Sequence, residues 1–167
     1  MFGTLDKSAI ISMLKSNVKA HICFYDGIMN HLVPVWYFYE GNSIFGFPAI
    51  PCSLEKMRKS SLACFEINEQ LNTEIYHEVI IWGSCTSLSD AGEKKRVMRH
   101  FISIKDRHRK WKSYKLTAIN SKRLNPDQVF NANAPVFRMD IQHIAGYETF
   151  QNEEEIQATL PGKRSFR

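Results

Sequence analysis

Residues 31–65 read HLVPVWYFYEGNSIFGFPAIPCSLEKMRKSSLACF, and this stretch sets the pattern for the chain. It begins with two apolar runs, 31–39 and 43–47, whose aromatic and β-branched residues predict strands. Between them lies Glu40-Gly41-Asn42, a short turn in which Gly and Asn can take positive φ, so the two runs form a hairpin. Two prolines then keep residues 48–52 from being either a helix or a central strand.

A short basic helix at 53–59 and a third strand-like run at 61–67 complete this stretch. A helix N-terminus offers free N–H groups and the positive end of a dipole, and both favour anions. The order of strand, turn, strand, proline-rich loop, helix start and strand therefore suits a flat aromatic ligand whose acidic end meets this helix. Ser53 and Lys56 would offer a hydroxyl and a positive charge to a phosphate. The alternative is an ordinary solvated surface helix.

Two longer helices are predicted outside this stretch. Apolar residues repeat at helical spacing over 5–16, which predicts an amphipathic helix there. Asp90 can cap a second helix, and Glu93 follows three residues later as in a capping box. The apolar side of this second helix is formed by Val97, Phe101 and Ile104, with Met98 and Ile102 beside them.

The remaining apolar runs predict strands. Residues 18–25 alternate between apolar and polar, the period of a strand with one buried face. Longer strands are expected at 75–88 and 135–147, with Gly83 either a bulge or a point of close backbone approach. Because short turns connect most of the strands, the sequence predicts a mainly β (α+β) protein. Its core would be a six-stranded antiparallel barrel with two or three appended helices.

The 167 residues suffice for one domain with a single sizeable core. We expect this domain to span 1–150 and residues 151–167 to form a C-terminal tail. The four cysteines contain no CxxC pair, so metal-ligand spacing is absent. The first residues lack the basic start and the long apolar core of a signal peptide, so none is expected, and no apolar run approaches the roughly 20 residues that span a bilayer. These features predict a reduced cytoplasmic protein without membrane contact.

Basic residues are concentrated in one segment. Residues 94–123 hold 12 of the 22 basic residues and a single acid, Asp106, so they carry +11 and the rest of the chain −6. Such asymmetry attracts anions. Within this segment, 105–112 mixes cations with an aromatic side chain, Trp111. Three interpretations follow. The segment is a solvated loop, it binds nucleic acid, or it covers the far end of a bound cofactor. Of the first two, we favour the solvated loop.

The order of several short motifs resembles that of a known family. The chain is similar to the pyridoxamine-phosphate-oxidase-like flavin-binding split barrels, and within them to the small nitroimidazole-resistance reductases. The likeness extends from about residue 10 to about residue 150. The motifs that carry it are Val33-Pro34-Val35, Trp36-Tyr37-Phe38, Ile44-Phe45, Met57-Arg58-Lys59, Cys64-Phe65-Glu66, Val79-Ile80-Ile81-Trp82-Gly83 and Val136-Phe137-Arg138-Met139-Asp140.

This resemblance implies a six-stranded split barrel that forms a homodimer with two flavins at the subunit interface. The cofactor would be FMN, with FAD as the alternative, and the acceptor a small molecule such as a nitro compound. Trp36 and Trp82 could each form a wall for the flavin ring, whereas a strand tryptophan more often packs in a core or a dimer interface. The expected cofactor-binding residues are Val33, Pro34, Val35, Trp36, Phe45, Gly46, Phe47, Pro48, Ser53, Lys56, Met57 and Trp82.

The sequence departs from these reductases at two positions. Ser53 stands where they usually carry a basic phosphate-binding residue, and Lys56, three residues later on the same helix face, could replace it. Arg58, Lys59 or the basic 105–112 segment of a second subunit are further options. Gly46 stands where they commonly carry a histidine beside the ring. Glycine allows close approach of a ring to the backbone but transfers no proton, so no catalytic residue is assigned.

The predicted function is therefore a flavin-dependent oxidoreductase acting on small molecules. A pyridoxamine-phosphate-oxidase-like enzyme is the alternative within the same fold. The alternative from a different class is a non-enzymatic module that binds flavin, or that binds nucleic acid through residues 94–123. No spacing of histidines, cysteines or carboxylates predicts a metal site or a catalytic triad.

Overall fold

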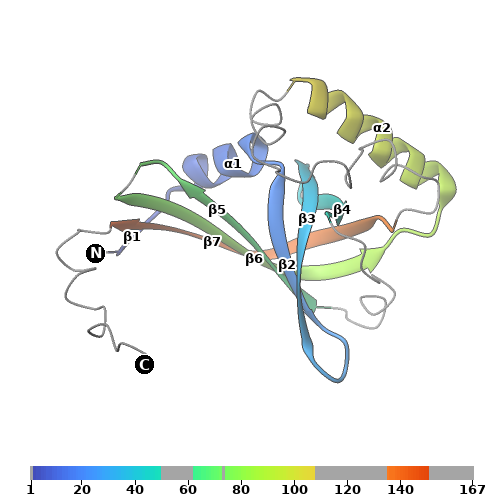
Figure 1. Ribbon diagram of the computed structural model, residues 1–167, viewed down its shortest axis with the longest axis horizontal. Helices are drawn as coiled ribbons and strands as arrows, with labels where there is room; N and C mark the ends of the chain where they lie inside the picture. The colour runs from blue at the N-terminus through green and yellow to red at the C-terminus, as the bar shows by residue number, and fades with distance from the viewer. Residues whose placement is uncertain (1, 50–61, 73, 108–134, 151–167) are drawn as a thin grey trace, which may run out of the picture.

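The computed structural model describes residues 2–49, 62–72, 74–107 and 135–150 (Figure 1). The described chain consists of strands and two helices. In chain order these elements are β1 (Phe2–Thr4), α1 (Lys7–Ser16), β2 (Lys19–Tyr25), β3 (Asn30–Glu40), β4 (Ser43–Pro48), β5 (Leu62–Gln70), β6 (Ile75–Ser87), α2 (Ala91–Arg107) and β7 (Phe137–Phe150).

Six of the strands close into an antiparallel barrel. The order around the barrel is β2-β3-β4-β7-β6-β5, and β5 pairs back with β2. On one edge of β7, β4 pairs with residues up to Asp140 and β1 pairs from Tyr147 onward, so the residues between them pair with neither strand on that edge. The barrel is thus split along β7. This confirms the predicted six-stranded split barrel, and β1 is a short extra strand that the sequence did not predict.

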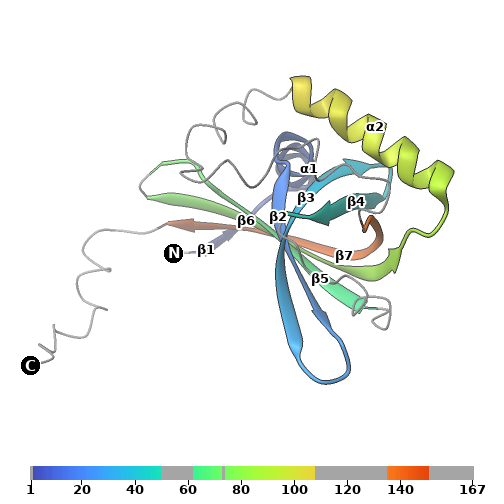
Figure 2. The same ribbon diagram turned by 45° about the vertical axis from the view of Figure 1, so that its right-hand side comes forward.

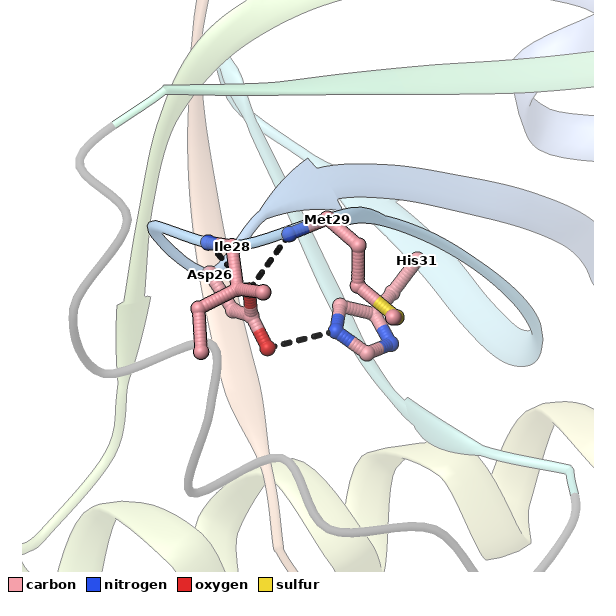
Figure 3. Close-up of polar contacts among 4 residues, drawn as sticks. All are labelled: Asp26, Ile28, Met29 and His31. Atoms are coloured by element: carbon pink, nitrogen blue, oxygen red, sulfur yellow. Dashed lines mark hydrogen bonds and ion pairs between the residues drawn. The ribbon is translucent and has the colours of Figure 1, made fainter.

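The turn that joins β2 to β3 is built around one carboxylate (Figure 3). Asp26 accepts hydrogen bonds from the backbone N–H groups of Ile28 and Met29, each at 2.9 Å. Its second oxygen pairs with His31 Nε2 at 2.7 Å. Gly27 takes a φ of 99°, which residues with a side chain rarely adopt. The turn sets the register of the β2–β3 pairing, which runs from Tyr25 opposite Asn30 to Lys19 opposite Trp36.

The β3–β4 turn follows the prediction only in part. Gly41 has a φ of 64°, as expected. Asn42 does not, since no non-glycine residue in the described part of the chain has positive φ. Its side-chain amide instead donates to the carbonyl of Ile141 on β7 at 3.1 Å. Asn42 therefore ties the tip of the hairpin to the split edge of the barrel.

The barrel interior is apolar and fully packed. Alternate residues of every barrel strand point inward, and α1 adds three buried side chains, Ile10, Met13 and Leu14. Tyr37 and Phe65 meet edge to face at 5.0 Å between ring centroids. Each such fully buried side chain contributes about 1.5–3 kcal/mol to folding. The strand residues of this core are Ala20, Ile22, Phe24, Val33, Val35, Tyr37, Ile44, Ala63, Phe65, Ile67, Val79, Ile81, Cys85, Phe137 and Met139.

The second helix, α2, covers the outer face of β3 and β4 (Figure 2). Ile102, which the sequence placed on the apolar side of this helix, is 43% exposed, because it follows Phe101 by one residue and so points about 100° away from it around the helix. Val97 and Phe101 are buried, as the sequence predicted. They pack with Phe38, Phe45 and Phe47 in a second core outside the barrel. Asp90 caps the helix by accepting from the N–H of Glu93, so the predicted cap is also confirmed.

Gly83 marks an irregularity in β6, as expected. The register between β6 and β7 shifts between Trp82 and Gly83, because Trp82 faces His143 while Gly83 faces Ile141. A Cβ on Gly83 would lie 2.1 Å from the carbonyl oxygen of Asp140. Both alternatives, bulge and close backbone approach, therefore hold at this point.

Other predictions fall on residues outside the described ranges. These are the helix at 53–59, the basic residues from 108 onward and the tail at 151–167. Within the described part of the chain, neither helix combines the length and apolar character that crossing a bilayer requires.

Candidate functional site

Most of the predicted cofactor-binding residues lie on two adjacent strands. β3 and β4 pair so that Val35 faces Pro48 and Trp36 faces Phe47. Val33 and Val35 point into the barrel and belong to its core. Pro34 accepts a hydrogen bond from the N–H of Ala49 at 2.8 Å, which continues the β3–β4 contact beyond the end of β4. The structure thus brings the 33–36 and 45–48 segments together.

The two phenylalanines of β4 are covered by α2. Phe45 and Phe47 are 5% and 2% exposed. Phe47 meets Phe101 edge to face at 4.8 Å, and Phe45 stacks on Phe38 at 5.3 Å. Their rings hold the helix on the sheet, so their side chains are not open to a ligand in this arrangement.

Gly46 lies between those two phenylalanines and faces the barrel interior. A Cβ placed there would lie 2.6 Å from the Phe137 ring and 2.6 Å from the carbonyl oxygen of Trp36. The space that a side chain would need is therefore filled by the protein itself. A histidine at this position, as in the reductases that the sequence resembles, would require Phe137 to move.

The outer face of the β2–β3 hairpin carries polar side chains beside the predicted cofactor-binding residues of β3. Lys19 and His21 project outward and face Trp36 and Pro34, respectively, in the register. The Lys19 Nζ lies 4.6 Å from the Trp36 ring centroid, a cation–π distance. Partial burial of this ammonium group lowers the pKa of Lys19. This hairpin face offers a half-buried indole beside a cation, which suits a flat, electron-poor or anionic ligand.

Sequence reasoning missed Lys19 and His21. The alternation over 18–25 already placed both on the outer face. The β2–β3 turn at Asp26-Gly27 then determines which β3 residues they face. Combining the two patterns would have added them to the candidate site.

Trp82 does not lie beside this group. It is on β6, and β2 and β5 lie between β6 and β3.

The outer-face neighbours of Trp82 form a row across five strands, because each member directly faces the next in the register. We call this the apolar row, and it consists of Leu32, Cys23, Cys64, Trp82 and His143. Leu32 and Trp82 are 65% and 41% exposed, so the row is an uncovered apolar surface.

Cations gather on the outward side of α2. Arg96, Arg99 and His100 line an open depression of about 380 Å³ together with Gly92. Arg96 pairs with Glu40 at 2.9 Å and lies over the Phe45 ring, and His100 lies against Phe38. This depression therefore belongs to the hairpin-tip end of β3 and β4. The opposite end of the β3–β4 pairing, at Pro34 and Pro48, is where the predicted site lies.

The other expected cofactor-binding residues come from the segment that follows β4. Ser53, Lys56 and Met57 lie outside the described residues, as does most of 105–112. In the ranges that the structure does describe, no three side chains of His, Cys, Asp or Glu gather where they could hold a metal ion. A cofactor here would have to be held by apolar, aromatic and basic groups.

No protein-family model matches the chain, and no curated protein matches its sequence. Solved structures do match its fold. A FAD-binding protein from Mesorhizobium loti superposes with a TM-score of 0.67 at 18% identity, over 89% of this chain and 99% of that one. A candidate 5-nitroimidazole antibiotic resistance protein from Bacteroides thetaiotaomicron gives 0.61 at 16% identity, over 90% and 89%.

A third structure is a candidate pyridoxamine 5'-phosphate oxidase from Corynebacterium glutamicum, with a TM-score of 0.57 at 14% identity, over 91% of this chain and 96% of that one. At these identities the similarity concerns the fold. It extends over about nine-tenths of this chain in each of the three structures. This chain has the split-barrel fold of the pyridoxamine 5'-phosphate oxidase-like proteins.

Proposed function

We propose that this protein is a flavin-binding oxidoreductase that reduces small molecules, with nitro compounds such as nitroimidazoles as the acceptor class. The observation that carries the proposal is the fold match to a FAD-binding protein along 89% of this chain and 99% of that one. Matches to a candidate nitroimidazole resistance protein and a candidate pyridoxamine 5'-phosphate oxidase support it further. FMN and FAD both remain candidates for the cofactor.

The flavin would bind at the end of the β3–β4 pairing that is marked by Pro34 and Pro48. Trp36 offers an aromatic face there, Lys19 a cation, and Pro34 a strand position without an N–H. The chain continues from Pro48 toward Ser53 and Lys56, which would hold the phosphate. When bound, the flavin supplies the electron transfer, because it accepts electrons from a donor and passes them to the acceptor. The protein binds and orients it and keeps water from its ring.

Trp82 can join this site only from a second copy of the chain. Adjacent strands lie about 4.8 Å apart, so three steps from β3 to β6 amount to about 14 Å along a curved wall. Within one copy, Trp82 therefore faces away from the Trp36 group. In a homodimer built on the apolar row, Trp82 of one copy would approach β3 of the other. The exposed Leu32 and Leu62, at 65% and 64%, support this assembly.

The basic segment after α2 would cover the far end of the cofactor. Phe101 of α2 touches Phe47 near the end of β4, and the helix continues to Arg107. In this proposal the cations of 105–112, which follow in the sequence, would reach the phosphate end of the cofactor. A pyrophosphate and adenosine would gain more from them than a single phosphate, which favours FAD.

The visible absorption spectrum of the purified protein tests the proposal. We expect flavin bands at about one flavin per chain, followed by release of FMN or FAD in chromatography. With a reduced nicotinamide as donor under anaerobic conditions, the bound flavin should bleach and then reoxidise when a nitroimidazole is added. A colourless protein that takes up neither flavin, and binds DNA with a steep salt dependence, would instead support a nucleic-acid-binding module.

Replacing 105–112 with a neutral linker of equal length tests the choice between the two flavins. We expect FAD affinity to fall by at least tenfold and FMN affinity to change less, because the removed charges face the distal half of FAD. The matched control is Lys94→Gln with Lys95→Gln, which removes two charges at the far end of α2. Equal losses for both flavins would contradict the proposed position of the segment.

A further inference from the structure

Three cysteines lie in the described part of the chain, and all are free. Cys23 on β2 and Cys64 on β5 are both half-buried, whereas Cys85 on β6 is buried in the barrel core. Cys23 and Cys64 face each other directly in the β2–β5 register. Two thiols at facing positions on one sheet surface form a pair rather than two isolated groups.

The hydrogen-bond pattern of the sheet defines the spacing of this pair. The N–H of Tyr37 donates to the carbonyl of Val18 at 3.0 Å, so these two form a hydrogen-bonded pair between β3 and β2. Hydrogen-bonded pairs alternate along a strand, so Cys23, five residues on from Val18, turns its N–H and C=O toward β5 instead. Cys23 and Cys64 are therefore a hydrogen-bonded pair, in which the Cα atoms lie about 5.5 Å apart. Disulfides usually join Cα atoms about 5.5–6 Å apart and Cβ atoms about 3.5–4.5 Å apart. The Cα spacing of this pair therefore suits a disulfide, and its Cβ atoms must move closer together when the bond forms.

Both thiols are on the outer face of the barrel. Their neighbours Ile22, Phe24 and Phe65 point into the core, so the alternation places the two cysteines outward. Burial raises the pKa of Cys64, and the charges of Cys23 and Glu66 raise it further.

We propose that Cys23 and Cys64 form an oxidisable dithiol site, which a small disulfide such as oxidised glutathione converts into an intramolecular disulfide between β2 and β5. One thiolate attacks the glutathione disulfide and forms a mixed disulfide, releasing one glutathione thiolate. The second cysteine thiolate then attacks the protein sulfur of that mixed disulfide and releases the second. Two protein thiols lose two electrons and two protons, and oxidised glutathione becomes two reduced glutathiones.

The position of the pair links its oxidation to assembly. Cys23 and Cys64 lie in the middle of the apolar row, between Leu32 and Trp82. In the homodimer proposed above, a second copy covers this row. The oxidation rate should therefore fall as protein concentration rises through the dimerisation range. This dependence rests on the proposed dimer, whereas the disulfide itself needs only one chain.

Peptide mapping after oxidation tests the site. The protein carries Cys52→Ser, so that the cysteine outside the described residues cannot exchange. It is incubated with oxidised glutathione and digested with chymotrypsin without reduction, since cleavage after Phe65 and Trp82 separates Cys64 from Cys85. We expect a cross-linked peptide pair containing Cys23 and Cys64. Cys85 should stay free, because burial raises the pKa of its thiol to about 12.

The single variants Cys23→Ser and Cys64→Ser are the matched controls. Each should give a glutathione adduct on the remaining cysteine and no cross-link. Stable adducts on both cysteines of the parent protein, or disulfides only between two copies, would overturn the proposal. An intramolecular disulfide that forms at a rate independent of protein concentration would support the dithiol site and contradict the proposed dimer face.

Discussion

At the scale of single residues, the packing around Gly46 explains why this predicted site position is a glycine. Its missing side chain leaves room for Phe137 and for the carbonyl of Trp36, each 2.6 Å from where a Cβ would lie. Phe137 is far away in the sequence, so no local pattern could reveal this neighbour. The sequence suggested that Gly46 allows a ligand to approach the backbone, and the structure shows a close approach from within the protein.

Gly46→Ala should therefore destabilise the fold. We expect a loss of about 1–3 kcal/mol in the free energy of unfolding, because the added methyl group overpacks a rigid interior. Denaturant unfolding measures this loss. The matched control is Gly3→Ala on β1, where the nearest atom to a Cβ would be at an ordinary 3.7 Å and the change should stay within about 0.5 kcal/mol. Equal stability of the two variants would show that the strands around Gly46 yield easily.

At the scale of elements, the β2–β3 hairpin depends on the Asp26 turn (Figure 3). Two backbone N–H groups and His31 bind its carboxylate, and these contacts lower the pKa of Asp26 well below its usual range. A depressed pKa in the folded state means that the charged form stabilises the fold at neutral pH. This stabilisation shrinks as the pH falls below the usual carboxylate pKa toward the depressed one.

Asp26→Asn should consequently lower the melting temperature at pH 7 by a few degrees, and the difference from the parent should narrow as the solution is acidified below about pH 4. Thermal unfolding at a series of pH values measures both effects. Glu74→Gln is the control, because it neutralises an exposed carboxylate outside this turn. A difference that stays constant down to the lowest pH would contradict the role of the Asp26 charge.

The elements themselves were largely predictable, because their causes are local. Periodicity located α1 and β2 within about two residues, the Asp90 cap began α2, and the turn at Gly41 gave the β3–β4 hairpin. The three-residue β1 is too short to show a period. The positive φ expected for Asn42 was wrong. The hydrogen-bond partner of its side chain, the Ile141 carbonyl, lies on a distant strand, so the local sequence does not reveal it. Local rules find a turn and leave its long-range contacts undetermined.

At the scale of the whole molecule, barrel closure determines which residues can share a site. The sequence grouped Trp36 and Trp82 as walls for one ring, and the closed barrel separates them by two strands. The motif order that predicted the fold contains no information about which faces meet across a subunit boundary. Outer-face residues such as Lys19 emerge only when the register of the hairpin is added to the alternation.

The apolar face predicts an assembly that can be broken selectively. Leu32 on β3 and Leu62 on β5 are about two-thirds exposed on the outer face of the barrel, and exposed apolar surface of this kind often marks an interaction site. Sedimentation equilibrium should show a dimer for the parent protein and a monomer for Leu32→Glu with Leu62→Glu, because two charges per copy would be buried without partners. The melting temperature of the isolated variant chain should remain high enough for a folded monomer, since neither side chain is in the core.

Leu71→Glu is the matched control, because Leu71 is 52% exposed but follows the end of β5, away from the apolar row. It should leave the dimer intact. If Trp82 completes a flavin site across the interface, the monomeric variant should also lose bound flavin while the Leu71 variant keeps it. A parent protein that is monomeric at every concentration would contradict the shared site, and a dimer that survives both charged substitutions would move the interface to another face of the barrel.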